Sequence, residues 1–499
     1  MMKRTLEIAV PLFVLLILLM PLRGGFTDDG FIHIQYANNV IERGEYSFNP
    51  GEVSFGTTSP LWVMELAALG SMTGGGETLI TISRVLSWLA GFASILVLYA
   101  LVIALGGRRW TALLAASVFA ADAWFVRWTA LSMETSTAAL AVLLMAFASV
   151  RAYRSQRSAA FLGVAIALAS LVRPEVYLAV PVYLVSVLSM RGRVDRRCVW
   201  ATLAVTAALL VPWFLFAKIH IGSFTPNTAG AKSGGLILDP LTFLAKFEPV
   251  VKIVGSTQAL LVLAVILAAA LVRGASRLFA PSMRFIVLWI AALPAAYVLF
   301  DIQILSRYLL LVTPLVCVAG WIAVEDLVDK RLRSGVGKVV MAALAAVTIA
   351  VSVAFYLKVV VPPSRAFSHD LTHNMKGIAG FIRENSAEDA VVAAADIGYL
   401  AFYSGRRVLD LGGLVEPATG ELRARHSYEE IIQTGLFLGL DGYPHVDLFI
   451  DRALEPDRFE DRVMSGLRFE RIYQTRVSNL GIRKPGPYYY TLYRLDPQQ

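Results

Sequence analysis

The chain has 499 residues, of which 57% are hydrophobic and only 16% charged, and its mean hydropathy is +0.63. A soluble domain carries about 25% charged residues, so this balance excludes an ordinary soluble protein and indicates a membrane protein. The net charge of +8 does not indicate binding to nucleic acid, because the basic residues follow a membrane-topology pattern.

Apolar stretches that could cross a bilayer recur from the N-terminus to residue 361. A membrane-spanning helix needs about 20 apolar residues. No small-x-small cleavage site follows the first stretch, so we expect a retained helix and not a signal peptide. Two of the stretches are short, and Arg173-Pro174-Glu175 between them could form a re-entrant turn. The sequence predicts about eleven spans, at 5–22, 78–105, 111–126, 129–150, 159–172, 176–190, 199–217, 258–272, 285–300, 308–324 and 339–361.

The loops between these spans alternate between basic and nearly uncharged. If the N-terminus is cytoplasmic, the short outer turns carry only Arg127, Arg173 and Arg307. The positive-inside rule then predicts a multi-pass protein of the cytoplasmic membrane, with its N-terminus inside and its C-terminal region outside. The basic residues of the inner segments are Lys3, Arg4, Arg108, Arg109, Arg151, Arg154, Arg157, Arg191, Arg193, Arg196, Arg197, Arg273, Arg277, Arg284, Lys330, Arg331, Arg333 and Lys338.

Two regions outside the predicted spans are long enough to carry function. The first outer loop covers 24–77, and within it 31–42 has the helical period of an amphipathic helix at the membrane surface. The polar tail covers 362–499 and alternates helix-like and strand-like patterns. We therefore predict a transmembrane domain, 1–361, and a C-terminal extracytoplasmic α/β domain, 362–499. Its strands are expected at 391–395, 407–411, 446–450 and 488–495.

Asp28 and Asp29 lie just past the first span. On the predicted topology the pair is at the outer face of the bilayer, where it could act on a sugar carried by a membrane lipid. An ionised carboxylate at a helix N-terminus could accept the proton of an acceptor hydroxyl that attacks the sugar. The second carboxylate could orient that hydroxyl or hold a divalent cation such as Mg²⁺, Mn²⁺ or Ca²⁺. Alternatively, Thr27 or one aspartate simply caps the helix at 31–42.

A departing phosphate would need cations to neutralise it. The candidates on the predicted outer side are Lys232, Arg307 and Arg173. Each has a simpler interpretation: a solvated loop lysine, an interfacial anchor, and an ion pair with Glu175 that joins two helix ends. Glu134 lies near the outer end of a predicted span, where an acid is costly unless it is paired or faces water.

Several other chemistries have no signature in the sequence. No Gly-rich phosphate loop, Walker pattern or dinucleotide fingerprint is present, so nothing indicates ATP or a nucleotide-sugar donor. Cys198 and Cys317 fall at different predicted depths, so we expect no disulfide between them. His33 has no second histidine or cysteine at metal-ligand spacing, and we interpret it as a polar helix residue.

Short motifs in a fixed order resemble those of a known superfamily. They are Asp28-Asp29-Gly30-Phe31-Ile32, Tyr36-Ala37-Asn38-Asn39, Phe48-Asn49-Pro50-Gly51-Glu52, Gly56-Thr57-Thr58-Ser59-Pro60-Leu61-Trp62, Met133-Glu134-Thr135, Arg173-Pro174-Glu175, Pro226-Asn227-Thr228 with Lys232, Arg307-Tyr308, Asp396-Ile397-Gly398 and Asp410-Leu411-Gly412-Gly413-Leu414. Together they resemble the GT-C membrane glycosyltransferases, and most closely the branch with the terminal arabinofuranosyltransferases of the cell wall. One departure is Gly56-Thr57, where that branch has an aromatic residue.

The resemblance implies a polytopic GT-C fold and an inverting transferase. Such an enzyme takes arabinofuranose, or another pentose or hexose, from a polyprenyl-phosphate donor at the outer leaflet. Its acceptor would be a cell-envelope glycan, lipid or protein. The resemblance assigns the base to Asp28 or Asp29. It implies that donor phosphate and substrate are bound by Lys232, Arg307, Tyr308, Asn227, Glu134, Arg173, Glu175, Thr58 and Ser59.

Two other functions remain open from the sequence. A transporter or flippase of lipid-linked sugars would place ionisable residues near mid-membrane and show repeated, broken helices, which are not evident here. A non-catalytic membrane scaffold with a glycan-binding tail would make the loop acids dispensable.

Overall fold

The computed structural model describes residues 2–190, 194–226, 235–271, 276–440, 442–443, 445–482 and 484–497. The chain forms two compact units. Unit 1 comprises Met1–Arg23, Arg84–Trp213 and Ser233–Val361, whereas unit 2 comprises Gly24–Ser83, Phe214–Lys232 and Pro362–Gln499. The first loop is therefore grouped by its contacts with the C-terminal tail and not with the helices that flank it in the sequence.

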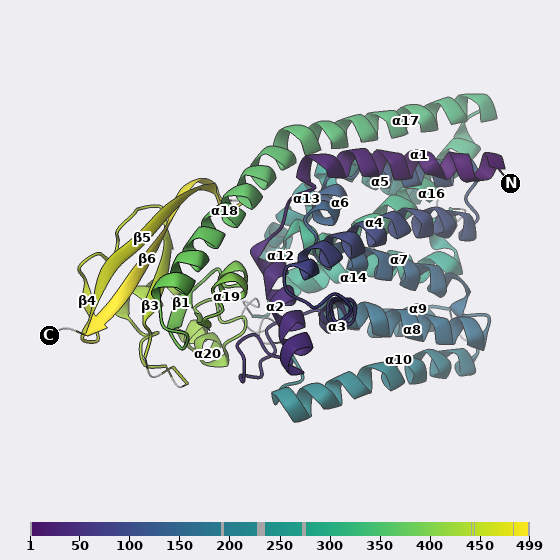
Figure 1. Cartoon of the computed structure of the whole chain (residues 1–499). Coiled ribbons are helices and arrows are strands. Elements are labelled where there is room, and N and C mark those ends of the chain that lie inside the picture. Colours follow the sequence, from purple (N-terminus) through teal and green to yellow (C-terminus); the bar gives the residue numbers. More distant parts are fainter. Residues whose placement is uncertain are drawn as a thin grey trace. The chain divides into compact units, whose positions relative to one another are not determined.

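Unit 1 consists of helices that run side by side (Figure 1). Six helical segments in the described part of the chain are long and apolar enough to cross a membrane. The fold is thus helical and membrane-like as expected, while the count of eleven spans stays a prediction. The longer helices are α1 (Met2–Leu19), α4 (Thr78–Ala104), α5 (Arg109–Ala120), α6 (Ala123–Ala130), α7 (Thr135–Ala152), α8 (Gln156–Val172), α9 (Ala179–Leu188), α10 (Arg196–Phe216), α13 (Glu248–Leu271), α14 (Arg284–Leu299), α16 (Thr313–Arg331) and α17 (Ser334–Phe355).

The predicted span 111–126 is wrong in one respect, because the helix breaks inside it. Helix α5 ends at Ala120 and α6 begins at Ala123. Asp122 between them is buried, and its carboxylate accepts hydrogen bonds from the backbone N–H groups of Trp124 and Phe125 at 3.1 and 3.0 Å. An aspartate that caps a new helix in this way ends the preceding one, although the sequence around it is apolar.

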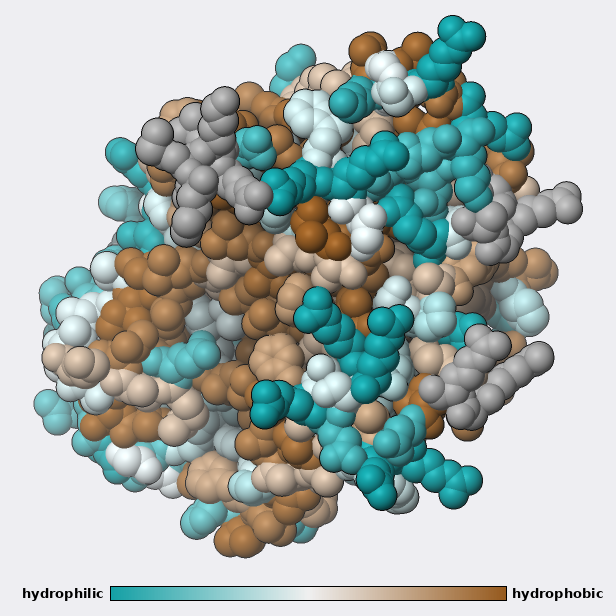
Figure 2. Space-filling model, turned by 90° about the vertical axis from the view of Figure 1, so that its right-hand side faces the viewer, coloured by the Kyte–Doolittle hydropathy of each residue, from teal (hydrophilic) through white to brown (hydrophobic). Residues whose placement is uncertain are grey.

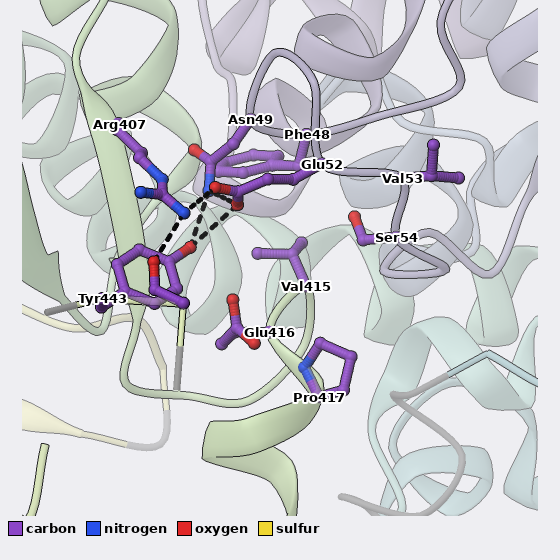
Figure 3. A pocket seen from close by; sticks show the side chains of 11 residues that line it. Phe48, Asn49, Glu52, Val53, Ser54, Arg407, Val415, Glu416, Pro417 and Tyr443 are labelled. Atoms are coloured by element: carbon purple, nitrogen blue, oxygen red, sulfur yellow. Dashed lines mark hydrogen bonds and ion pairs between the residues drawn. The ribbon is translucent and has the colours of Figure 1, made fainter. Parts of the chain in front are cut away.

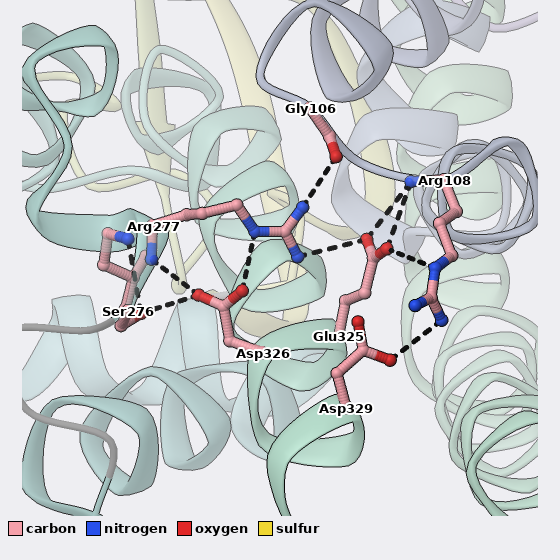
Figure 4. Close-up of polar contacts among 8 residues, drawn as sticks. Gly106, Arg108, Ser276, Arg277, Glu325, Asp326 and Asp329 are labelled. Atoms are coloured by element: carbon pink, nitrogen blue, oxygen red, sulfur yellow. Dashed lines mark hydrogen bonds and ion pairs between the residues drawn. The ribbon is translucent and has the colours of Figure 1, made fainter. Parts of the chain in front are cut away.

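Unit 1 contains a network of ion pairs, the Glu325 network, made of Arg108, Arg277, Glu325, Asp326 and Asp329 (Figure 4). Arg277 donates from Nε to Asp326 at 2.6 Å and lies 3.3 Å from Glu325, while Arg108 donates to Asp329 at 2.8 Å. All five residues belong to segments that the topology prediction assigns to the inner side. Figure 2 views the molecule from the side on which Figure 1 marks the N-terminus, and it shows hydrophilic side chains in patches among hydrophobic ones.

Unit 2 is built on a mixed sheet with the strand order β2-β1-β3-β6-β5-β4. β1 pairs in parallel with β2 and β3, whereas the other pairings are antiparallel. The core contains Phe449, Phe459, Phe469 and Tyr493, whose rings pack against one another. The strands are β1 (Val391–Ala394), β2 (Arg407–Asp410), β3 (Leu448–Ala453), β4 (Val463–Met464), β5 (Leu467–Asn479) and β6 (Pro485–Pro497).

The helices of unit 2 come from both ends of the chain. The expected amphipathic helix is α2 (Asp28–Arg43), and α3 (Pro60–Gly70) follows it. Helix α18 (Val361–Asn385) runs beside the long strands, and its Asn374 and Asp370 hydrogen-bond to β5 (Figure 1). Three short helices complete the unit: α19 (Gly398–Ser404), α20 (Pro417–Arg425) and α21 (Tyr428–Thr434).

Candidate functional site

Asp28 connects the first loop to the C-terminal part of unit 2. Its carboxylate accepts hydrogen bonds from the backbone N–H groups of Gly398 at 3.1 Å and Tyr399 at 3.0 Å, at the start of α19. The cap of its own helix α2 is Thr27, whose hydroxyl accepts from the N–H of Gly30 at 3.2 Å. Asp28 is therefore not the cap of α2, and its side chain is held in one orientation by groups 370 residues away in the sequence.

A second acid, Asp396, lies close enough to Asp28 to affect its charge. Arg452 donates to both oxygens of Asp396 at 2.7 and 2.6 Å, and the hydroxyl of Tyr490 donates at 2.6 Å. Burial is the main reason why the pKa of Asp28 rises from 3.8 to about 7, and the nearby charge of Asp396 adds to it. The two backbone donors oppose this rise. Asp28 is thus a carboxylate that can take up a proton near neutral pH.

The close approach of α2 to α19 depends on Gly398. A Cβ atom at this position would lie 2.1 Å from the backbone oxygen of Asp28 and 2.9 Å from the Cβ of Phe31. The ring of Phe31 in turn packs against Tyr399, with centroids 4.0 Å apart. The Asp396-Ile397-Gly398 motif, which is one of the motifs of the family resemblance, supplies both a charged neighbour and a hydrogen-bond donor to Asp28.

The other predicted residues of the first loop occupy different places. Asp29 lies in the first turn of α2 and is partly exposed. Ser59 is fully buried and precedes α3, whereas Thr58 is partly exposed. His33 is buried and its Nδ1 pairs with the hydroxyl of Thr57 at 2.7 Å, which fits its interpretation as a polar helix residue.

Unit 1 contains a second cluster, here called the Tyr308 cluster, made of Arg127, Trp128, Glu134, Arg173, Glu175, Arg307 and Tyr308. The guanidinium carbons of Arg173 and Arg307 lie 5.0 and 5.3 Å from the ring centroid of Tyr308. Arg127 and Arg307 lie 4.3 and 5.7 Å from the ring of Trp128, whose Nε1 donates to Ser306 at 3.0 Å. Aromatic faces thus hold three arginines near one another.

Two carboxylates partly balance these arginines. Arg173 lies 3.4 Å from Glu134 and 4.0 Å from Glu175, so the predicted pairing of Arg173 with Glu175 is present but the shorter ion pair is with Glu134. Arg173 and Glu134 are 4% and 1% exposed, which makes this a buried pair. The Nε and Nη2 of Arg173 make no hydrogen bond with the described residues. Among the described residues the cluster thus contains three arginines and two glutamates.

The structure therefore brings together Glu134, Arg173, Glu175, Arg307 and Tyr308, all of which were predicted from sequence. Asn227 and Lys232 lie outside the described residues. Sequence reasoning missed Trp128 and Arg452, because a tryptophan beside a predicted span and an arginine in a strand carry no local signature. Arg127 was noted only as an outer-turn residue, and its position before Trp128 was the available signal.

Cys198 and Cys317 are both buried and form no disulfide with each other. Among the residues that the structure describes, no three His, Cys, Asp or Glu side chains are grouped in a way that could hold a metal ion. A divalent cation on Asp28 and Asp29 therefore rests on the sequence alone.

The comparison with known protein families gives a match to the C-terminal tail. Residues 367–493 match a family described as "Domain of unknown function (DUF8728)". No curated protein matches the chain.

Solved structures resemble the chain over most of its length. ArnT from Cupriavidus metallidurans bound to undecaprenyl phosphate is 15% identical, with a TM-score of 0.60 over 98% of both chains. The archaeal oligosaccharyltransferase AglB from Archaeoglobus fulgidus, in complex with an inhibitory peptide and a dolichol-phosphate, is 14% identical. Its TM-score is 0.59, over 90% of this chain and 69% of AglB. The chain thus has the GT-C fold, while the arabinofuranosyltransferase branch is not confirmed.

Proposed function

We propose that the chain is an inverting membrane glycosyltransferase that moves a sugar from a polyprenyl-phosphate donor to a cell-envelope acceptor. The reaction would take place at the outer face of the cytoplasmic membrane, with the N-terminus inside. The observation that carries the proposal is the Tyr308 cluster, because several arginines held together beside aromatic rings are suited to an anion such as a lipid phosphate. Structural neighbours with the same fold hold undecaprenyl phosphate and dolichol-phosphate, which supports this class of donor.

In the proposed reaction the carboxylate of Asp28 takes the proton of the acceptor hydroxyl. The acceptor oxygen forms a bond to the anomeric carbon, and the bond between that carbon and the phosphate oxygen breaks. The phosphate leaves with the bonding electrons and stays on its lipid, so a single displacement inverts the configuration. No proton is needed on this leaving group, which is why one base suffices.

Asp28 suits the role of base for two reasons. Its orientation is fixed by two backbone donors, which holds it ready without rearrangement. Its pKa of about 7 lies near neutral pH, where a general base combines adequate basicity with a sufficient ionised fraction. Asp29 would support it by orienting the acceptor hydroxyl or, as an alternative, by holding a divalent cation. The sugar, whether arabinofuranose or another pentose or hexose, is left open by the observations.

The test uses the purified full chain in lipid nanodiscs with a panel of polyprenyl-phosphate sugars. Release of free polyprenyl phosphate is measured in the presence of envelope glycan acceptors, with and without a chelator. Asp28→Asn should lower the rate by about 10²–10⁴-fold, the usual contribution of a general base. Asp389→Asn, which changes an exposed acid of the same unit, is the matched control.

The outcomes separate the candidates. Full activity in both Asp28→Asn and Asp29→Asn would remove the catalytic assignment. No release from any donor, together with uptake of a lipid-linked sugar across the membrane, would favour the transporter. Loss of release on chelation, restored by Mg²⁺, Mn²⁺ or Ca²⁺, would support the cation-binding role of the acidic pair.

A further inference from the structure

Unit 2 contains a polar cavity at which the first loop meets the C-terminal residues, here called the Tyr443 pocket. Its volume is about 220 Å³. Figure 3 shows side chains from both segments directed into the same space. The first loop contributes Phe48, Asn49, Glu52, Val53 and Ser54, and the C-terminal segments contribute Arg407, Val415, Glu416, Pro417, Gly442 and Tyr443.

One wall of the pocket is held rigid by its own hydrogen bonds. The hydroxyl of Tyr443 donates to Glu52 at 3.0 Å, and Asn49 donates to the same oxygen of Glu52 at 3.0 Å (Figure 3). Asn49 also joins the sheet, because it donates to the carbonyl of Val408 and accepts from its N–H, both at 3.0 Å. The polar groups of this wall are therefore fixed in position before any ligand arrives.

On that wall an arginine contacts both a carboxylate and an aromatic ring. Arg407 forms an ion pair with Glu52, and its guanidinium carbon lies 4.3 Å from the ring centroid of Tyr443. On the other side Glu416 accepts from the N–H of Ala418 at 3.3 Å. Among the described residues that line the pocket there are two carboxylates and one arginine, and that arginine is paired with Glu52.

These features indicate which ligands fit. A net negative pocket disfavours phosphate and other anions. Among the described residues, no third carboxylate, histidine or cysteine lies with the two glutamates in a way that could hold a metal ion, so nothing here supports a metal ion as the ligand. The cavity is smaller than the roughly 300–1,000 Å³ of sites for drug-sized ligands, so it suits a single ring. Carboxylates, an amide and a phenol can hydrogen-bond hydroxyl groups, while Val415 and Pro417 offer apolar surface to the C–H groups of a ring.

We infer that the Tyr443 pocket binds one neutral or amine-bearing sugar ring of a glycan. If the proposed function holds, this ring belongs to the acceptor chain or to the glycan product, and the pocket positions that chain through a sugar away from the one that reacts. The binding of a sugar ring itself does not depend on the transfer reaction.

The test is saturation-transfer NMR on the full chain in detergent without any lipid donor. The probes are methyl α-arabinofuranoside, methyl α-mannopyranoside, glucosamine and glucuronate. Single rings of this size should bind with dissociation constants of about 1 mM. At least one of the first three should bind about tenfold more tightly than glucuronate, because the glutamates repel a carboxylate.

Two variants test the pocket, one by removing a charge and the other by filling its opening. Glu416→Gln keeps an acceptor for the N–H of Ala418 but loses the charge, and it should weaken binding about tenfold. Val53→Lys places a long cation at a half-exposed position of the rim and should block the pocket without disturbing buried groups. The matched controls are Glu421→Gln on the exposed side of α20 and Met72→Lys at an exposed site of the same loop; both should bind as the parent does.

The inference is overturned if no probe gives a signal or if both pocket variants bind the sugars as the controls do. Transfer from a lipid donor is then measured in the same preparations. Intact transfer without sugar binding would overturn only this inference. Sugar binding that depends on Glu416, in a protein that transfers no sugar from any donor, would overturn only the proposed function.

Discussion

The Glu325 network and the Tyr308 cluster, both in unit 1, differ in how completely the nitrogens of their arginines are hydrogen-bonded to the described residues. In the Glu325 network, Arg277 donates from Nε to Asp326, from Nη1 to the carbonyl of Gly106, and lies within ion-pair distance of Glu325 (Figure 4). In the Tyr308 cluster, Arg173 is more deeply buried, yet two of its nitrogens make no hydrogen bond to the described residues.

Burying a donor without an acceptor costs free energy, so each such case needs an explanation. In the Glu325 network each of the five side chains forms an ion pair with another member, which suits a permanent structural contact. In the Tyr308 cluster three arginines lie against aromatic rings, and under the proposed function they would bind an anion. The comparison teaches that the number of unmade hydrogen bonds, and not the presence of charges, distinguishes these two groups.

The largest expected effect comes from Arg173→Gln. If the Tyr308 cluster neutralises the leaving phosphate, this change should lower kcat/KM for the lipid donor by about 10²–10³-fold, as loss of one group that stabilises developing charge does. The measurement is release of polyprenyl phosphate at several donor concentrations. An unchanged kcat/KM in folded Arg173→Gln protein would show that the Tyr308 cluster is a structural contact. It would then not differ in role from the Glu325 network.

Arg277→Gln should have the opposite profile. Removing it leaves the buried Glu325 and Asp326 short of a partner, and breaking a buried pair costs about 3 kcal/mol. We expect faster thermal inactivation of the purified protein but an unchanged kcat/KM for the fraction that stays folded. A selective loss of donor use in this variant would contradict the structural role of the Glu325 network.

Gly398→Ala extends the comparison to Asp28, whose carboxylate accepts hydrogen bonds from two backbone N–H groups among the described residues. The added methyl group would overlap the backbone of Asp28, so we expect a destabilisation of about 1–3 kcal/mol and a lower transfer rate. Gly380→Ala is the control, since nothing lies within 4 Å of its added Cβ and alanine favours a helix. Equal behaviour of the two variants, measured by thermal denaturation and transfer rate, would refute the importance of this contact.

The smallest effect is the pH dependence of the parent protein. With a pKa of about 7 for Asp28, the transfer rate should fall up to tenfold for each pH unit below 7 and level off above it. The pKa of Asp28 in the folded protein exceeds the ordinary value of 3.8, so the folded state holds this proton more tightly than the unfolded state. Protonation of Asp28 therefore stabilises the folded state fully below about pH 4, and this contribution to the free energy of unfolding is lost as the pH rises through 7. Asp28→Asn should lack that part of the stability change. A rate that is flat from pH 5 to 8 would remove the assigned base.

The sequence pattern was sufficient to predict those helices and strands whose formation depends mainly on neighbouring residues. The helical period of 31–42 predicted α2, which extends to Asp28–Arg43 because Thr27 caps it. Apolar, β-branched runs predicted β1 and β2 to within one residue at their C-terminal ends. Strand β5 was missed, because Leu467–Asn479 mixes charged, polar and apolar residues without a regular alternation and only three of its residues are buried. The cap at Asp122 was hidden by the apolar residues around it.

The sequence by itself determined the membrane class of this protein, its helical character and the acidic pair beyond the first span. The reason is that hydropathy, periodicity and the bilayer's thickness act on neighbouring residues. Only the tertiary structure decided which partners each charge has: Gly398 and Tyr399 for Asp28, Glu134 for Arg173, and Glu52 for Arg407. Burial and charge pairing depend on groups that come together through space, and no spacing along the chain encodes them.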